Sequence, residues 1–158
     1  IAILLETLTD NKNRTSSAIR STFTKSGGNM AESGSVMWQF SQKGIVIVDA
    51  QEDLAEEMAL TAIDAGADDF ETYDSTLEIF AAPSNLEEVR RALTGKSAEI
   101  RSSELAMIPQ NTVMLDSKTA KQTLRLMDLL EDLDDVQKVY SNADFPDEAL
   151  SEYGNESQ

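Results

Sequence analysis

Residues 44–82 read GIVIVDAQEDLAEEMALTAIDAGADDFETYDSTLEIFAA and contain four successive signals of secondary structure. The run GIVIVDA is rich in β-branched residues and predicts a strand. A helix is predicted from Asp53 to Ala65, because apolar residues recur on one face and Gly66 follows directly. DDFETYD and TLEIFAA then predict a hairpin that turns at Asp74-Ser75. The predicted apolar face of the helix consists of Leu54, Met58, Ala62 and Ala65.

The next residues complete this unit with another helix and another strand. In SNLEEVRRALTG, Ser84 and Glu87 fit a capping box, and Gly95 predicts the C-terminal stop. Residues 97–107 predict a strand, which Pro109 ends because proline cannot donate a hydrogen bond to the ladder. The order strand, helix, strand, strand, helix, strand is that of a ferredoxin-like βαββαβ domain. We therefore predict an inserted ferredoxin-like domain at residues 43–109.

The residues before this domain predict a strand, a helix and a second strand. IAILLETL is short and rich in Ile and Leu, as expected for a buried strand. A helix can begin with Asn11 or Asn13 as its cap and continue to about Lys25, where the Gly-Gly pair that follows ends it in the left-handed region. GSVMWQF, which begins at Gly34, predicts the second strand, with Trp38 as a packing residue.

The residues after the inserted domain repeat this order. TVML predicts a strand, Asp116 or Ser117 caps a helix over KTAKQTLRLMDLLEDL, and VQKVYSN predicts a final strand. Each flank is too small to bury a core alone, so we predict that residues 1–42 and 110–145 pair as one discontinuous α+β domain. Residues 146–158 are acidic and polar, and we predict a frayed tail there.

The composition excludes many kinds of site. The chain has 158 residues, 13 of them basic and 29 acidic, and its net charge of -16 repels nucleic-acid backbones and anionic membranes at long range. Cysteine and histidine are absent, which excludes disulfides, thiolate and imidazole metal sites and the Ser-His-Asp triad. Acidic pairs such as Asp68-Asp69 and Asp134-Asp135 lack the order of an EF-hand loop, and we interpret them as solvated turns. We therefore predict no metal, no cofactor and no small-molecule substrate.

The loop ETLTDNKNRT, residues 6–15, places polar and basic residues directly after a strand of an acidic chain. Lys12, Arg14, Arg20 and Lys25 are four of the 13 basic residues, and they lie within one window that contains no acidic residue. Two interpretations stay open. Asn and Asp side chains can simply cap the helix. Alternatively, the helix N-terminus and its neighbouring cations can bind a phosphate group of RNA or DNA.

Six collinear motifs resemble one known family. They are ETLTDNKNRT, KSGGN, GSVMWQFSQKG, AIDAGADDFETYD, AMIP and RLMDLLEDLDDVQKVYSN, and together they extend over about residues 1–145. They are similar to the second and third domains of the YebC family, which includes the mitochondrial translational activator of cytochrome c oxidase. The resemblance implies a three-part protein whose basic, helical first domain is absent from this chain. Ile1 agrees with that expectation, because an apolar strand without an initiator Met is already in progress there.

The resemblance also implies a non-enzymatic role, so there are no catalytic residues to predict. Family motifs and local charge together give candidate contacts for nucleic acid or the ribosome: Thr9, Asp10, Asn11, Lys12, Asn13, Arg14, Thr15, Arg20 and Lys25. Family motifs and backbone chemistry give the candidate structural positions: Gly27, Gly28, Asn29, Gly34 and Pro109.

Three functions are compatible with these observations. The leading hypothesis is a ribosome- or RNA-associated translation factor that eases the synthesis of difficult, proline-rich stretches, as the resemblance implies. The alternative is a DNA-binding transcriptional regulator, although no helix-turn-helix or basic recognition helix is evident. An enzyme or small-ligand module in the ferredoxin-like domain is the third, and it lacks a supporting motif. We expect a monomer without membrane contact, in the cytoplasm or, in a eukaryote, the mitochondrial matrix.

Overall fold

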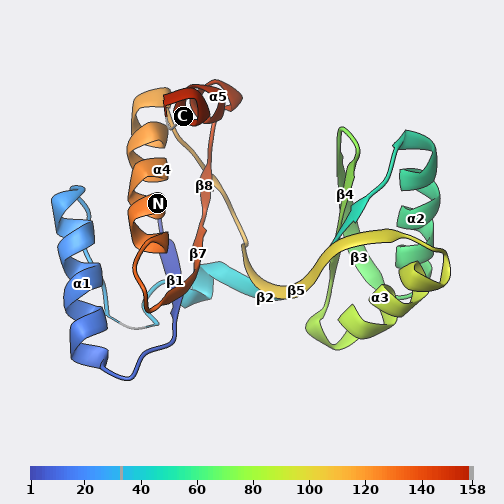
Figure 1. Cartoon of the computed structure of the whole chain (residues 1–158), viewed down its shortest axis with the longest axis horizontal. Helices are drawn as coiled ribbons and strands as arrows, with labels where there is room; N and C mark the ends of the chain where they lie inside the picture. Colours follow the sequence, from blue (N-terminus) through green and yellow to red (C-terminus); the bar gives the residue numbers. More distant parts are fainter. Residues whose placement is uncertain (33, 157–158) are drawn as a thin grey trace. The chain divides into compact units, whose positions relative to one another are not determined.

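The computed structural model describes residues 1–32 and 34–156, and the chain divides into two compact units (Figure 1). The first unit comprises Ile1–Ser41 and Pro109–Gln158, and the second comprises Gln42–Ile108. The predicted boundaries, after residue 42 and before residue 110, lie within one residue of these limits. The second unit is therefore continuous in sequence, whereas the first is assembled from both ends of the chain.

The second unit contains a four-stranded sheet and two helices. Its strands lie in the order β3-β4-β2-β5, and β4 pairs antiparallel with both β2 and β3. The helices α2 and α3 pack beside each other (Figure 1). In chain order the elements are β2 (Phe40–Asp49), α2 (Glu52–Asp64), β3 (Ala67–Tyr73), β4 (Thr76–Ala81), α3 (Leu86–Gly95) and β5 (Glu99–Pro109).

The core of this unit lies between the sheet and its helices. Strand β4 alternates between buried and partly exposed residues, and Leu77 and Ile79 are fully buried. They pack in one cluster with Val89 and Leu93 of α3. The predicted core face of α2 is partly wrong, because Leu54 is 52% exposed. The helix instead buries Ala55, Met58, Ala59 and Ala62, whose mostly small side chains allow close packing.

The start of α3 differs from the prediction, whereas its end at Gly95 agrees with it. A short 3-10 turn at Pro83–Asn85 precedes the helix, and no side chain caps its first turn. The predicted Ser84–Glu87 capping box is therefore wrong, and Glu87 forms an ion pair with Arg90 instead. Gly95 is the last helical residue, and the left-handed residue that follows is Ser97, with φ +61°.

The first unit is built on an antiparallel pair of strands, β1 (Ile3–Thr7) and β7 (Val136–Ser141), with α1 and α4 beside them (Figure 1). Ile19 and Phe23 of α1 share a buried cluster with Leu126 and Leu130 of α4. The remaining elements are α1 (Lys12–Lys25), the 3-10 turn η1 (Met37–Gln39), β6 (Val113–Met114), α4 (Ser117–Glu131), β8 (Ala143–Asp144) and α5 (Asp147–Glu156).

Helix boundaries in the first unit confirm several predictions. Asn11 caps α1, because its side chain accepts a hydrogen bond from the Arg14 N–H. Gly27 ends the helix with φ +82°, a conformation that favours glycine. Asp116 caps α4 by accepting from the Thr119 N–H at 2.7 Å. The sequence therefore predicted the helix caps and the glycine stop correctly at these positions.

Two other predictions for the first unit are wrong. Residues 34–39 of GSVMWQF form successive turns, with the Met37 N–H bonded to the Gly34 carbonyl, and Phe40 belongs to β2. Trp38 is 72% exposed rather than packed. The predicted frayed tail contains the helix α5. Ala149 of this helix is fully buried against Leu115 and Ala120, and the hydrophobic contact offsets the loss of chain entropy. None of the helices in the described part of the chain is long and apolar enough to cross a membrane.

Two glutamates lie opposite each other on neighbouring strands of the second unit, and their repulsion can be tested. Glu78 of β4 lies opposite Glu71 of β3, and burial, followed by the charge of Glu71, raises the pKa of Glu78. The ionised pair opposes folding above the folded-state pKa, and this penalty disappears as the pH falls below the unfolded-state pKa. Glu78→Gln should therefore raise the free energy of unfolding by about 0.2–1 kcal/mol near pH 7.

Urea denaturation near neutral pH and in acid measures this effect. The gain should shrink in acid, where Glu78 of the wild type is protonated. Glu99→Gln, which changes an exposed glutamate on β5, is the matched control and should change stability little. A loss of stability in Glu78→Gln at neutral pH would contradict the proposed repulsion.

Candidate nucleic-acid interface

Asp135 connects three parts of the first unit at the start of α1. It lies between α4 and β7, and its carbonyl accepts a hydrogen bond from the Leu8 N–H at 2.9 Å. The Thr15 hydroxyl donates to Asp135 Oδ2 at 2.6 Å and lies 2.7 Å from the hydroxyl oxygen of Thr9. That Thr9 oxygen accepts from the Asn11 N–H at 3.0 Å. The loop, the first turn of α1 and the segment before β7 are thus held together by one aspartate.

Arg14 binds the same carboxylate from the solvent side. Its Nη2 lies 3.0 Å from Asp135 Oδ2 and 2.9 Å from Asp10 Oδ1, and its Nε also donates to Asp135 at 3.3 Å. The Asp135 side chain is only 20% exposed, whereas those of Arg14 and Asp10 are 55% and 87% exposed. The Arg14–Asp135 pair therefore has better shielding from solvent than the Arg14–Asp10 pair.

These contacts stabilise the charged forms of both Asp135 and Arg14 and so shift the pKa of each. The hydrogen bond from Thr15, followed by that from Arg14, holds the pKa of Asp135 below its usual value. The two carboxylates raise the pKa of Arg14 in turn, with the Asp135 hydrogen bond as the largest cause. Asp135 is accordingly ionised across the whole neutral range.

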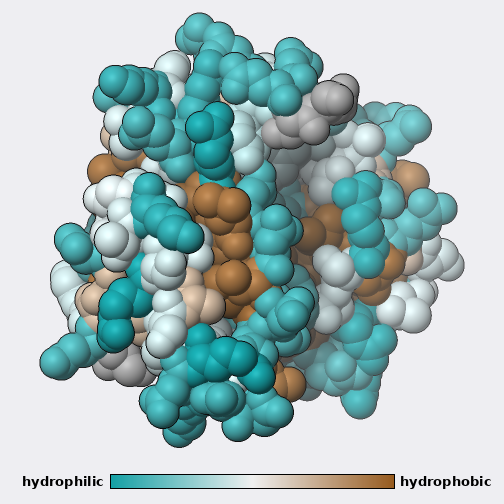
Figure 2. Space-filling model, turned by 60° about the vertical axis from the view of Figure 1, so that its left-hand side comes forward, coloured by the Kyte–Doolittle hydropathy of each residue, from teal (hydrophilic) through white to brown (hydrophobic). Residues whose placement is uncertain are grey.

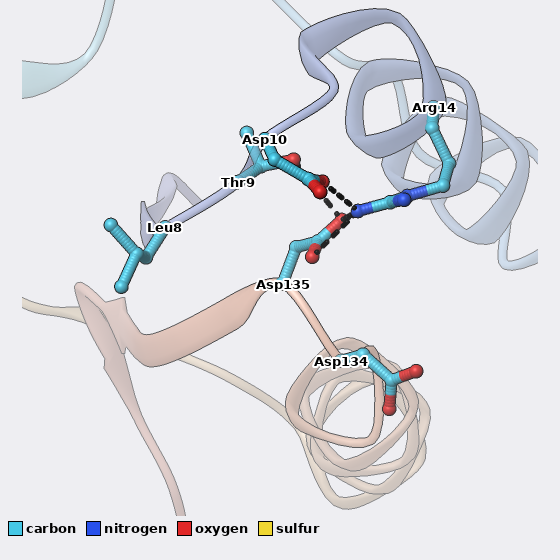
Figure 3. Close-up of a pocket in the computed structure, with 6 residues that line it drawn as sticks. All are labelled: Leu8, Thr9, Asp10, Arg14, Asp134 and Asp135. Carbon is cyan, nitrogen blue, oxygen red and sulfur yellow. Dashed lines mark hydrogen bonds and ion pairs between the residues drawn. The ribbon is translucent and has the colours of Figure 1, made fainter.

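The surface around this cluster is a shallow pocket lined by Leu8, Thr9, Asp10, Arg14, Asp134 and Asp135. Figure 3 shows Asp10, Arg14 and Asp135 pointing toward one another, whereas Leu8 and Asp134 point away from them. Carboxylates outnumber the single guanidinium here, so a phosphate would have to displace anions that already neutralise Arg14. The geometry gives Thr9, Asp10, Asn11, Arg14 and Thr15 structural roles, and their contact with nucleic acid stays a prediction.

The other predicted contact residues face solvent. Lys12, Asn13, Arg20 and Lys25 are exposed along α1, and within the described residues none of the three cations forms an ion pair. The helix presents Asn13, Ser17, Ser21 and Thr24 on the side opposite its buried residues, with Arg20 and Lys25 at the two edges. We call these six residues the α1 outer face. The three hydroxyl residues of this face were not predicted as contacts, although helical spacing from Asn13 could have identified them.

An apolar groove lies elsewhere in the first unit. Its lining includes Ile1, Leu5, Phe23, Met37 and Leu126, and its charged lining residues are Lys12 and Glu32. On the face of the molecule that Figure 2 presents, hydrophobic side chains gather in an elongated strip between hydrophilic ones. One cation balanced by one carboxylate makes this groove a poor phosphate site.

The predicted structural positions lie at chain reversals and ends. Gly28 follows the left-handed Gly27, and a side chain at Gly28 would come within 3.3 Å of the Phe23 ring. Gly34 is also left-handed, at φ +84°, but it opens a series of turns rather than a strand. Pro109 is the last residue of β5, and Asn29 is exposed in the segment after α1. Among the described residues, no three carboxylates are arranged to hold a metal ion.

These elements define a mixed α/β protein of two compact units. A model of the TACO1/YebC second and third domain matches residues 1–143. The chain belongs to the TACO1/YebC family, which confirms the resemblance predicted from its motifs.

Curated relatives and one solved structure agree with this assignment. The chain is 48% identical over 159 residues to a "Probable transcriptional regulatory protein" of Halothermothrix orenii, covering 99% of the chain and 63% of the relative. It is 44% identical over 157 residues to a protein of the same description from Dehalococcoides mccartyi, covering 99% of the chain and 62% of the relative. The crystal structure of the conserved hypothetical protein Aq1575 from Aquifex aeolicus superposes with a TM-score of 0.83 at 37% identity, covering 92% of this chain and 60% of that one. The chain thus spans less than two thirds of each.

The buried position of Thr15 generates a stability prediction. Thr15→Val keeps the side-chain volume and the helix propensity but removes the donor to Asp135. The carboxylate then loses its shortest hydrogen bond, and we expect the free energy of unfolding to fall by about 1–3 kcal/mol. Chemical denaturation measures this change. Thr24→Val, at an exposed position of the same helix, should change it by less than about 0.5 kcal/mol, and an equal loss in both variants would refute the role of the hydroxyl.

The lowered pKa of Asp135 predicts a specific pH dependence. Because the folded-state pKa lies below the unfolded one, the ionised carboxylate stabilises the fold above the unfolded-state pKa, and this stabilisation is lost as the pH falls through the folded-state pKa. Asp135→Asn should therefore be less stable than wild type at neutral pH, with a difference that shrinks in strong acid. Asp134→Asn is the control, since that side chain points away from Arg14 (Figure 3). A difference that stays constant with pH would contradict this account.

Proposed function

We propose that this chain is part of a gene-expression regulator that contacts ribosomal RNA through the α1 outer face and acts as a ribosome-associated translation factor. The observation that carries the proposal is the charge distribution along the chain. From Asn11 to Ala31 there are four basic residues and no acidic residue, although the whole chain has a net charge of -16. Arg14 is already paired with Asp10 and Asp135, but the other three cations form no ion pair among the described residues. An anionic polymer can therefore approach α1 more favourably than most of the remaining surface.

The side chains of the α1 outer face suit a backbone contact. Ser, Thr and Asn hydroxyl and amide groups bind phosphate and sugar oxygens, and Arg20 and Lys25 add positive charge on both sides. Hydroxyl and amide groups can also bond the 2′-hydroxyl groups that distinguish RNA from DNA. These groups lie on one helix whose start is bonded to Asp135, so the helix sets their spacing before binding.

The second unit is not part of the proposed RNA contact. Its elements follow the order βαββαβ, and its strands lie in the order β3-β4-β2-β5. These two features support the proposal that it is an inserted ferredoxin-like domain. That fold supports many functions, so the proposed RNA contact rests on α1 alone.

A second candidate is contact of the same face with DNA. The curated relatives carry the description "Probable transcriptional regulatory protein", which favours this alternative. The α1 outer face has few groups for reading base edges, because its members are short polar side chains, one lysine and only one arginine. The proposal therefore favours RNA, and a comparison of RNA and DNA binding distinguishes the two candidates.

Removing two cations from the α1 outer face should weaken RNA binding without unfolding the protein. We expect Arg20→Ala/Lys25→Ala to reduce co-sedimentation with ribosomes. The variant should also flatten the salt dependence of binding to a single-stranded RNA, by about one unit of slope for each phosphate that the protein no longer neutralises. Thermal stability should stay close to wild type, since both side chains are exposed and lack ion pairs in the described structure.

Two controls make the test decisive. Lys118→Ala/Arg125→Ala removes the same charge from exposed positions of α4 and should weaken binding less. A duplex DNA probe measured across the same salt series tests the second candidate. Equal weakening by the α4 variant, or tighter sequence-selective binding to DNA than to RNA, would overturn the proposed RNA contact.

A further inference from the structure

Helix α2 of the second unit exposes its large aliphatic side chains. Leu54, Leu60 and Ile63 are 52%, 61% and 39% exposed, and the buried side of the helix consists of three alanines and Met58. Single exposed apolar residues are common, but a helix that exposes every Leu and Ile it contains is not explained by packing within its own unit. Such a surface is typical of an interaction site.

Carboxylates surround the exposed aliphatic residues. Leu60 lies four residues after Glu56, three after Glu57 and four before Asp64, and residues at these spacings are neighbours on a helix surface. The helix has five acidic residues and no basic one, and none of the five forms an ion pair among the described residues. We call Asp53, Glu56, Glu57, Leu60, Ile63 and Asp64 the acidic α2 face.

The surroundings of this face reinforce its charge. Between Lys43 and Arg90 the chain contains no Lys or Arg, but it contains thirteen of the 29 acidic residues. Lys43, at one end of this segment, is already paired with Asp68. The resulting field repels nucleic acids and anionic membranes and attracts cations.

We infer that the acidic α2 face docks a Lys/Arg-rich polypeptide segment that carries apolar side chains. Charge complementarity selects the basic partner and steers its approach. Leu60 and Ile63 provide the apolar contact, and a helical partner with Lys or Arg on both sides of an apolar stripe would place its cations beside the carboxylates of this face. The apolar pair is needed because exposed ion pairs alone contribute little affinity.

This surface is distinct from the one proposed for RNA. The RNA contact involves α1 of the first unit, whereas the acidic α2 face belongs entirely to the second unit. Variants of α2 should therefore leave RNA binding unchanged, and each proposal can fail without the other.

The test uses the whole chain and a fluorescent amphipathic peptide made of Lys and Leu. Binding is measured by anisotropy, and the contact is located by changes in backbone amide chemical shifts. We expect the shifts to concentrate in residues 52–64. Leu60→Gln/Ile63→Gln and Glu56→Gln/Glu57→Gln should each weaken binding by about fivefold or more, the factor that corresponds to about 1 kcal/mol. Melting temperatures of both variants should match wild type, because all four side chains are exposed.

Matched variants and a second peptide distinguish docking on the acidic α2 face from nonspecific attraction between the peptide and the acidic protein. Leu129→Gln, at a 46% exposed leucine of α4, controls for the apolar change, and Glu131→Gln/Asp132→Asn controls for the charge change. Both should bind the peptide nearly as wild type does. Equal weakening by these controls, equal binding of a peptide of Lys without Leu, or chemical-shift changes spread over both units would overturn the inference.

Discussion

The antiparallel pairing of β1 with β7 is the constraint on which the first unit depends. Ile3 lies opposite Ser141, so the two flanks must meet before Ile19 and Phe23 of α1 can pack against Leu126 and Leu130 of α4. Loop-closure entropy opposes such a pairing, and the contacts must offset it. Asp135 contributes at the critical place, because it lies directly before β7 and bonds Leu8, Thr15 and Arg14 around the start of α1. A polar loop in an acidic chain is thereby explained by a partner more than a hundred residues away.

Elements governed by local chemistry could be predicted from the sequence. Asn11, Asp116 and Gly27 act through neighbours within one turn, and the structure confirms all three roles. Errors arose where the deciding contact is distant or competes with a local preference. Helix α5 is stabilised by the contact between Ala149 and Leu115. The local sequence of the acidic tail does not predict that contact. Residues 34–40 have a β-favouring composition, yet turns between Gly34 and Gln39 form there instead.

The candidate site shows the same limit. The sequence identified a window of cations, but it could not identify which of them are neutralised. Arg14 is paired with Asp10 and Asp135, whereas Arg20 and Lys25 form no ion pair among the described residues. Equal formal charges therefore differ in availability, since an anionic ligand gains little from a cation that already has two carboxylate partners. Availability depends on tertiary contacts, and only the fold reveals it.

Helix α2 extends this reasoning from charge to hydrophobicity. Hydrophobic periodicity places Leu54 in the core, but small residues at helical spacing let Ala55, Ala59 and Ala62 fill the narrow space over the sheet. Met58 is buried on the same side, so a larger side chain at Ala55, Ala59 or Ala62 would overpack this contact. Packing therefore places positions 54, 60 and 63 on the outer side of the helix, but it does not require branched apolar residues there, where they reduce solubility unless charges surround them. The carboxylates at helical spacing from Leu60 supply that charge, so one arrangement both keeps the exposed apolar residues compatible with solvent and selects a cationic partner for them.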